Sequence, residues 1–369
     1  LTKKHLSLCK GNLQKIGQEI LNVKRYLQLR IFVNAARVDQ DFRIRCQYSP
    51  NTEEGRLSSK ETPLGTGTNL QNQDRELRSM FLADRCCVSC GTYREDVPGS
   101  MRCLDCGDRM RKTVLVELDL SQAEGRVVYT LSGNKELLAL ARSKPWEFDM
   151  HSANAAELMS RLEGRTILPA EVTKEQRYLG KKTEHASQRG MRGDKLAGEA
   201  LKDGFTLTAD EAQAAIDAYM EAKPGIGVYM AKIRREVMRN KSLTNTWGRV
   251  WYCRYDAFGE DLWRVAYSVK PQSEVADITN QWGLKPAFNY LTKTGHGRVN
   301  LQCHDAIIAS VYPEHVYDYC AYMMTSLERP RIYWGESLTI PVGIKIGRTW
   351  AGDAEYKRLP SRADMDEVC

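Results

Sequence analysis

Two apolar segments, each interrupted by an aspartate, constrain the fold of this chain more than any other feature of its sequence. Asp119 breaks the apolar segment 112–120, and Asp305, preceded by His304, breaks the alternating segment 299–311. An ionised carboxylate within an apolar strand is costly unless it is paired or binds a cation. If the two strands lie side by side, the carboxylates meet, and a divalent metal ion would relieve their repulsion. The alternative is two unrelated aspartates at strand ends.

The chain between these segments carries helix signals from about residue 134 to 245. Thr208 and Glu211 form a capping box that predicts a helix ending at 223–225, and a second helix is expected over 228–239. The segment 338–345 alternates as a strand does. Strands on both sides of a helical block predict an α+β fold with helices inserted between two pieces of a sheet. Near the N-terminus, an apolar stripe predicts an amphipathic, core-facing helix (Leu13, Ile16, Ile20, Val23 and Leu27).

Composition excludes several classes of protein. With 369 residues, of which 42% are hydrophobic, the chain has the composition of a globular protein of two or three domains. No apolar run approaches the ~18 residues of a membrane span, and no signal peptide is visible. The net charge of +7 permits binding to a polyanion without requiring it. The eleven cysteines are odd in number and several lie in apolar runs, so we expect a reducing, cytoplasmic location.

Four cysteines have the spacing of a zinc site. Two C-x2-C pairs, Cys87 with Cys90 and Cys103 with Cys106, are separated by 12 residues, and a glycine follows each pair. Four thiolates at this spacing suit one tetrahedral, structural zinc ion. The alternatives are reduced or disulfide-paired cysteines, and Cys86 could replace Cys87. The basic flank of the cluster is either a DNA-contacting or a solvated surface (Arg85, Arg94, Arg102, Arg109, Arg111 and Lys112).

The two aspartates belong to motifs that follow a known order. The run from Asp119 to Arg126 resembles motif A of the family A DNA polymerases, the enzymes like bacterial DNA polymerase I and its phage relatives. Arg177, Lys181, His185, Arg189 and Gly190 keep the spacing of that family's motif B, and Cys303-His304-Asp305 resembles motif C. Further segments that agree are Gly55–Ser59 with Asn69–Asn72, Pro271–Gln272 with Ala276–Asp277, and Ile340–Trp350. The resemblance extends from about residue 50 to 352.

The resemblance implies a right-hand polymerase fold, with an antiparallel palm sheet, helical fingers and a partial thumb. The thumb or N-terminal helical part is expected over residues 1–50. The first part of the palm, with motif A, is expected over 51–133, including a four-cysteine zinc-ribbon insertion at 84–112. The fingers, with motif B, are expected over 134–262. The second part of the palm, with motif C and the C-terminal segment, is expected over 263–369.

The resemblance also implies the chemistry. In that family a primer 3′-hydroxyl attacks the α-phosphate of a nucleotide, assisted by two Mg²⁺ ions. Asp119 and Asp305 would be the catalytic carboxylates that hold these ions, with the backbone carbonyl of Leu120 as a further ligand. Ala306 stands where the family typically has a glutamate. Because that glutamate is the less essential carboxylate, we expect activity to be retained.

The motif B residues would bind the incoming nucleotide. Arg177 and Lys181 are one helical turn apart and would clamp the triphosphate; a solvated basic face is the alternative. His185 stands where the family usually has Phe or Tyr, and would stack on the base or touch the β-phosphate; a structural role is the alternative. Glu124 matches the family's glutamate that excludes the ribose 2′-hydroxyl. The family holds this glutamate with a tyrosine, where this chain has Arg189.

The arginine at that position leaves two interpretations open. Arg189 either pairs with Glu124, holding it or altering sugar selection, or contacts a template phosphate. Arg56, Arg264 and Gln272 match residues that contact the template or minor-groove base edges. His304 would contact the primer terminus.

The function implied by the resemblance is template-directed DNA synthesis, expected in phage DNA replication. The expected partners are primer–template DNA and dNTPs, with no membrane. The chain is expected to be a monomer that replisome proteins could join, in the host cytoplasm if viral. One alternative is a single-subunit RNA polymerase-like enzyme, against which Glu124 argues. Another is a catalytically inactive, nucleic-acid-binding relative, against which the presence of both Asp119 and Asp305 argues.

Overall fold

The computed structural model describes residues 43–95, 102–202, 205–254 and 259–369, with seven isolated residues nearer the N-terminus (Ile16, Glu19, Val23, Tyr26, Leu27, Val38 and Asp39). The chain divides into two compact units. We call one the sheet unit (29–123, 275–330 and 339–369) and the other the helical unit (1–28, 124–274 and 331–338). The predicted N-terminal part over 1–50 lies mostly outside the described residues. Ile16, Val23 and Leu27 of its apolar stripe are helical but about half exposed rather than core-facing.

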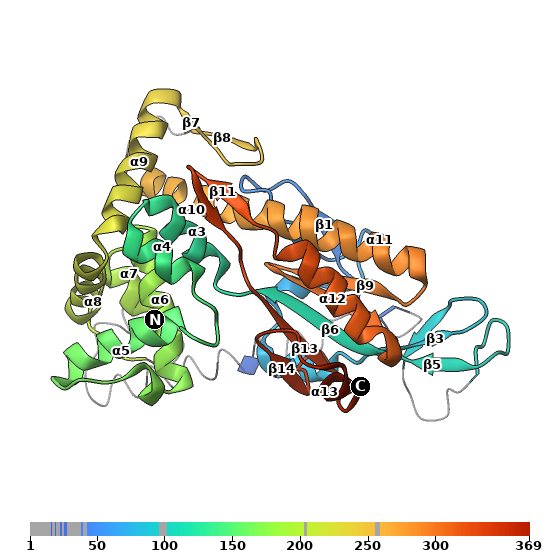
Figure 1. The fold of residues 1–369 in the computed structure, drawn as a ribbon. Coiled ribbons are helices and arrows are strands. Elements are labelled where there is room, and N and C mark those ends of the chain that lie inside the picture. The colour runs from blue at the N-terminus through green and yellow to red at the C-terminus, as the bar shows by residue number, and fades with distance from the viewer. Residues whose placement is uncertain are drawn as a thin grey trace. The chain divides into compact units, whose positions relative to one another are not determined.

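A five-stranded antiparallel sheet forms the centre of the sheet unit (Figure 1). Its strands follow the order β14-β13-β6-β10-β9, which confirms the predicted α+β class with an antiparallel sheet. β6 is central and covered on both faces, which explains its nearly continuous apolar sequence. The strands are β6 (Val114–Leu120), β9 (Gly297–Cys303), β10 (Ala306–Val311), β13 (Val342–Gly347) and β14 (Ala354–Tyr356).

The two faces of this sheet have different covers. One face carries Leu115, Leu301 and Ile308, which pack with buried side chains that include Leu70 and Trp350. On the other face, Ile307 of β10 approaches Gly283 and α12 (Val316–Leu327), where a Cβ on Gly283 would lie 3.2 Å from Ile307 and from Leu327. Alternation along β6 puts Leu115, Glu117 and Asp119 on the first face. Asp119 therefore lies at the exposed end of a face that is otherwise buried.

Two sequence-based strand predictions were wrong in their extent. The segment 299–311 is not one strand but the hairpin of β9 and β10, because the chain turns at His304 and Asp305. The polar pair that interrupts the alternation is the turn itself. The segment 338–345 is likewise split between β12 (Glu336–Leu338) and β13, with Pro341, which has no N–H to donate, in the connection.

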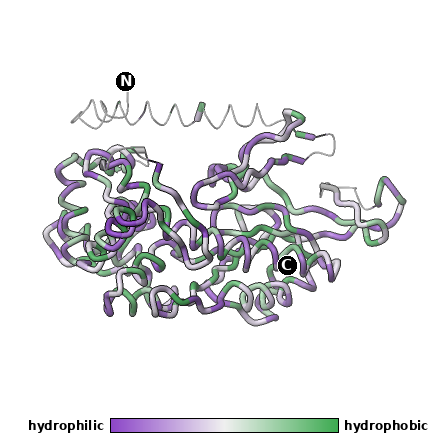
Figure 2. The backbone as a smooth tube through the Cα atoms, turned by 90° about the horizontal axis from the view of Figure 1, so that it is seen from above, coloured by the Kyte–Doolittle hydropathy of each residue, from purple (hydrophilic) through white to green (hydrophobic). Residues whose placement is uncertain are grey.

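The helical unit contains the helices that the sequence signals predict. α8 begins directly after its N-cap Thr208, with Glu211 of the capping box in its first turn, and ends at Ala222, as expected. α9 begins at Pro224, one turn earlier than expected, with proline in its first position. Figure 2 shows hydrophilic and hydrophobic residues interspersed along the backbone. The helices and hairpins are α3 (Ala123–Ser132), α4 (Lys135–Arg142), α5 (Met150–Glu163), η3 (Pro169–Glu171), α6 (Lys174–Gln188), α7 (Gly193–Lys202), α8 (Ala209–Ala222), α9 (Pro224–Asn240), β7 (Ser242–Thr244) with β8 (Val250–Tyr252), and β11 (Arg331–Tyr333) with β12.

Shorter elements complete the described chain. A three-stranded sheet in the order β4-β3-β5 carries the cysteine cluster, and α10 continues from the helical unit into the sheet unit. Among the described residues, no helix combines the length and the apolar character that crossing a membrane requires. The remaining elements are β1 (Gln47–Ser49), β2 (Ser58–Lys60), η1 (Leu70–Asn72), η2 (Arg75–Met80), β3 (Asp84–Cys87), β4 (Tyr93–Glu95), β5 (Met110–Lys112), α10 (Glu260–Ile278), η4 (Thr279–Leu284), α11 (Lys285–Thr294), η5 (Pro313–His315) and α13 (Arg362–Asp366).

Candidate active site and metal centre

The structure brings the backbones of Asp119 and Asp305 together at one end of neighbouring strands. Asp119, the penultimate residue of β6, pairs with Ala306 of β10. Asp305 directly precedes β10, and its carbonyl accepts the Leu120 N–H at 3.3 Å. The side chain of Asp119 is exposed and that of Asp305 is partly buried. The two carboxylates therefore stand at the same edge of the sheet.

Small residues flank Asp119 on both sides. Its cross-strand neighbours are Ala306 in β10 and Gly343 in β13. A Cβ on Gly343 would still lie 3.8 Å from the Asp119 carbonyl oxygen, so the glycine leaves room in the row. Glu117, two residues earlier on the same face, is instead bound by Lys345 at 2.9 Å and by the Trp350 indole N–H at 2.6 Å. Glu117 is therefore bound within the sheet, and Asp119 and Asp305 lie at the end of the strands beyond it.

Charged residues at this edge of the sheet contribute to the pKa of the Cys303 thiol. Burial raises the pKa of Cys303 to about 12; Arg78 opposes that shift, and the negative charges of Glu117, Asp305 and Asp119 add to it. Like charges held close together favour a cation between them. Two carboxylates with small neighbours, Ala306 and Gly343, fit a hard divalent ion such as Mg²⁺.

His304 and Asp305 form a tight turn that buried polar side chains support. His304 has a φ of 56°, in the left-handed region that residues other than glycine seldom adopt, although histidine is among those enriched there. The Gln302 side chain donates to the His304 carbonyl, and Gln71 donates to Gln302 Oε1 at 3.0 Å. The Gln302 N–H donates to the Tyr48 hydroxyl at 2.8 Å. These contacts hold a turn that would otherwise be disfavoured.

Sequence reasoning did not single out these supporting residues. Gln71 lies inside the Asn69–Asn72 segment that carries part of the family resemblance, and Gln302 directly precedes motif C. Asn69 caps η1, the short helix that carries Gln71, and accepts the Ser59 hydroxyl at 2.6 Å. Nothing in the sequence pattern pointed to Tyr48.

The four residues predicted to contact DNA divide between the two units. Arg56 and His304 belong to the sheet unit. Burial lowers the pKa of His304; Asp305 opposes that shift and Arg56 reinforces it. Arg264 and Gln272 lie on α10 in the helical unit, where Arg264 forms an ion pair with Asp261.

In the helical unit, Arg177, Lys181 and His185 follow each other at four-residue intervals along α6. The spacing places them on one side of the helix. Arg177 donates to Asp149 at 2.8 Å, and Asp149 also caps α5 by accepting two backbone N–H groups. Burial alone would raise the pKa of Asp149, but the hydrogen bond and charge of Arg177 hold it below its usual value. The carboxylate that caps α5 thus fixes the guanidinium of Arg177.

Arg189 and Glu124 meet at the other end of α6. Arg189, the C-cap of α6, donates to Glu124, in the first turn of α3, at 2.7 Å. Both side chains are partly buried. Of the two interpretations of Arg189, the structure shows the one in which Arg189 pairs with Glu124.

A buried carboxylate next to His185 was not anticipated. Glu184 is fully buried and accepts hydrogen bonds from His151 and Asn154, both at 2.9 Å, and from Gln188 at 3.0 Å. Burial would raise its pKa, but His151 lowers it below the usual value. For His185 itself, burial lowers the pKa to about 4. The only indication of this network in the sequence was a charged residue, Glu184, on the side of α6 that is buried.

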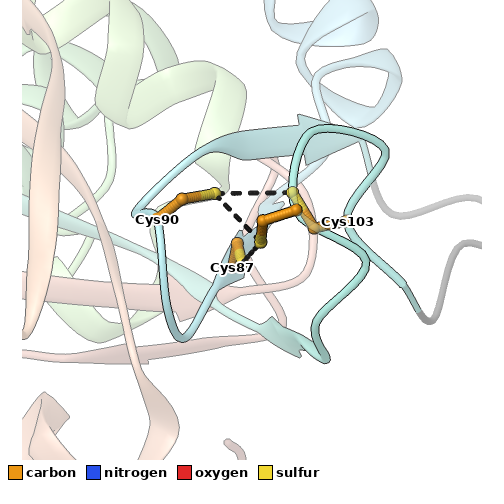
Figure 3. A group of neighbouring side chains, drawn as sticks. Cys87, Cys90 and Cys103 are labelled. Carbon is orange, nitrogen blue, oxygen red and sulfur yellow. Dashed lines mark hydrogen bonds between the residues drawn. The ribbon is translucent and has the colours of Figure 1, made fainter.

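The four predicted cysteines lie together, with their sulfur atoms within 4.8 Å of one another; Figure 3 labels Cys87, Cys90 and Cys103. The Sγ atoms of Cys87 and Cys106 are 3.4 Å apart, and those of Cys90 and Cys103 are 3.5 Å apart. Zinc–thiolate bonds of about 2.3 Å in a tetrahedron separate the sulfurs by about 3.8 Å, so the donor set fits zinc. The Cys86 thiol instead contacts the carbonyls of Cys87 and Gly91, at 3.6 and 3.7 Å, and takes no part in the cluster.

A model of DNA polymerase family A matches residues 100–352. Curated relatives include DNA polymerase I of Pseudomonas aeruginosa, 27% identical over 245 residues, covering 64% of this chain and 24% of that protein. The thermostable DNA polymerase I of Thermus thermophilus is 24% identical over 261 residues, covering 68% of this chain and 29% of that protein. The chain therefore spans about a quarter of the length of these relatives.

A solved structure shares the fold. The POL domain of Pol1 from M. smegmatis, in complex with DNA primer-template and dNTP, aligns with a TM-score of 0.64 at 20% identity. The alignment covers 88% of this chain and 51% of that one.

Proposed function

This chain belongs to DNA polymerase family A, and from that premise we propose that it is a template-directed DNA polymerase. The oxygen of a primer 3′-hydroxyl attacks the α-phosphorus of a dNTP that pairs with the template. The bond between the α-phosphorus and the bridging oxygen breaks, pyrophosphate leaves, and the hydroxyl proton is released. The primer gains one nucleotide in each cycle.

The single observation that carries this proposal is the register of β6 and β10. Asp119 pairs with Ala306, and the Asp305 carbonyl accepts the Leu120 N–H, so the two aspartates lie at the same end of neighbouring strands. They would hold two Mg²⁺ ions, with the Leu120 carbonyl as a further ligand. When bound, such ions activate the 3′-hydroxyl and neutralise charge on the leaving pyrophosphate.

The side chains of α6 would bind the incoming dNTP. Arg177 and Lys181 carry the positive charge for the triphosphate. A His185 with a pKa of about 4 is neutral near pH 7. It would therefore act by stacking on the base rather than as a cation beside the β-phosphate. Glu124, held by Arg189 at 2.7 Å, would exclude the ribose 2′-hydroxyl.

The remaining site residues would contact primer–template DNA. Arg56, Arg264 and Gln272 would reach the template or minor-groove edges, and His304 the primer terminus. Acceptors in the minor groove are common to all base pairs, so such contacts suit a sequence-independent enzyme. We propose replication of phage DNA in the host cytoplasm as the setting, with the chain acting as a monomer that replisome proteins can join.

The cysteine cluster would hold one structural Zn²⁺ ion. Cys87, Cys90, Cys103 and Cys106 supply four thiolates, which fill a tetrahedral shell. A closed shell leaves no position for water or substrate, so this site would take no part in the chemistry.

Primer extension by the 369-residue chain tests the function. We expect Mg²⁺-dependent extension with dNTPs and much less with NTPs. Asp119→Asn and Asp305→Asn should abolish extension while DNA binding persists. Asp318→Asn, which changes an exposed carboxylate of the same unit, is the matched control and should extend normally. Extension by either active-site variant at the wild-type rate would exclude the proposed chemistry, and a preference for NTPs would favour an RNA polymerase.

A further inference from the structure

The cysteine ribbon leads directly into β6, the strand that carries Asp119. β3 begins at Asp84 and reaches the ligand Cys87 in three residues. β5 ends at Lys112, and after Thr113 the chain continues directly into β6. Thr113 donates to the Asp84 carbonyl through both its N–H and its hydroxyl, at 2.9 and 2.7 Å. The entry and exit of the ribbon are therefore joined at the end of β6 that lies opposite Asp119.

The Asp84 carboxylate also binds the neighbouring strands of the sheet. It pairs with Arg298 of β9, accepts the Ser310 hydroxyl of β10 at 3.4 Å, and lies 3.0 Å from Arg43. The side chain of Asp84 is only 9% exposed. A buried carboxylate with several partners is costly to leave unpaired, so these contacts strongly favour one arrangement of the strands.

Aromatic contacts join the ribbon to the same strands a second time. The Arg298 guanidinium lies 4.0 Å from the ring centroid of Tyr93 in β4. Arg111 of β5 lies 4.4 Å from the ring centroid of Tyr312, which follows β10, and pairs with Glu314. Arg298 thus binds the sheet to the ribbon through both Asp84 and Tyr93.

The charge of the ribbon does not favour a DNA-binding surface. Residues 84–112 contain six lysines and arginines and five acidic residues. A divalent ion held by four thiolates adds two net negative charges. Arg85 is buried, and Arg111 is engaged with Tyr312 and Glu314. With metal bound, the segment would have no excess of positive charge.

We propose that the metal-loaded ribbon is a brace for the active site. Metal binding orders the segment that carries Asp84 and Tyr93, and these residues hold β9 and β10 in register with β6. The far ends of β6 and β10 carry Asp119 and Asp305, about 17 Å away at the usual rise per strand residue. Arg298 is accordingly a positioning residue. This inference rests on the proposed polymerase function.

Arg298→Gln tests the brace without altering the metal ligands. The rate of nucleotide addition at saturating DNA and dNTP should fall about 10- to 100-fold, because small displacements of reacting groups cost that much. The zinc content, the absorption spectrum of the Co²⁺-substituted ribbon and the Kd for primer–template should not change. Arg298→Lys, which keeps the charge beside Asp84, should recover part of the rate.

A matched variant separates the brace from a DNA contact. Arg109→Gln removes an exposed positive charge from the same ribbon and should leave the rate, the Kd and its salt dependence unchanged. Cys103→Ser should lose zinc and show the same loss of rate as Arg298→Gln.

Three results are diagnostic. Normal addition by Arg298→Gln overturns the brace, even if Cys103→Ser fails to fold. A salt-dependent loss of DNA affinity in Arg109→Gln, with Arg298→Gln unaffected, shows a DNA contact instead. If the zinc-loaded wild-type chain extends no primer, the proposed function is wrong and the proposed brace is wrong as well. If the wild type extends normally and Arg298→Gln does too, only the proposed brace is wrong.

Discussion

Arg189 donates a hydrogen bond of 2.7 Å to Glu124, joining the end of α6 to the start of α3. A charged, partly buried pair holds a carboxylate more tightly than a neutral hydroxyl does, and the planar guanidinium makes the geometry more demanding. Arg189 can therefore hold Glu124, as a tyrosine does in the family that the chain resembles.

The first prediction concerns sugar selection. Glu124→Ala should raise ribonucleotide incorporation relative to deoxyribonucleotide incorporation, because it opens space at the 2′ position. Arg189→Ala should do the same by releasing Glu124, and the double variant should be no worse than the worse single one. The measurement is the ratio of kcat/KM for dNTP and NTP. If Arg189→Ala only weakens DNA binding in a salt-dependent way, Arg189 contacts phosphate.

A second prediction concerns the triphosphate. Arg177→Gln should raise the KM for dNTP about tenfold or more, since a charge-assisted hydrogen bond contributes about 1.5–3 kcal/mol. Lys174→Gln, an exposed cation one turn earlier on α6, is the control and should leave KM unchanged. Steady-state primer extension with varied dNTP measures both. Equal effects of the two variants would indicate a general effect of charge on α6.

A third prediction follows from the low pKa of His185. Burial holds the ring neutral in the folded protein, with Glu124 and Glu184 opposing the shift and Arg189 and Lys181 reinforcing it. The unfolded chain binds a proton below about pH 6.5, whereas the folded chain does so only near pH 4. This stabilising contribution is therefore complete above pH 6.5 and is lost as the pH falls towards 4.

Unfolding experiments measure that contribution. Between pH 7.5 and 5, His185 should lower the free energy of unfolding by about 2 kcal/mol. His185→Gln should lack this decrease. The comparison uses denaturant unfolding of both proteins at the two pH values, with each protein at pH 7.5 as its own reference. Parallel pH dependences would contradict the assignment.

The fourth prediction is one zinc ion per chain. Metal analysis of protein purified without chelator should give about one equivalent, as a single four-coordinate site requires. Cys103→Ser should lose the metal and make the ribbon sensitive to protease, because zinc binding contributes to folding. Cys253→Ser, a cysteine outside the cluster, should retain it. A zinc content of zero with reduced cysteines would exclude the site.

The sequence alone determined the features that depend on neighbours in the chain. The spacing of Cys87, Cys90, Cys103 and Cys106 forms a compact donor set because each pair closes within one turn. The Thr208–Glu211 box begins α8 because its hydrogen bonds span three residues. The apolar run of β6 and the four-residue spacing on α6 likewise follow from the local geometry of strands and helices.

Only the tertiary structure decided the contacts between distant segments. The Arg189–Glu124 pair joins residues 65 positions apart, the Asp84–Arg298 pair joins residues 214 apart, and Gln71 reaches Gln302 across 231. The split of 299–311 into a hairpin also depends on the partner strand, because alternation looks alike on both sides of a two-residue turn. Hydrophobic periodicity reports which face of an element is buried, but a buried polar group finds its partner only when the topology brings the two elements together.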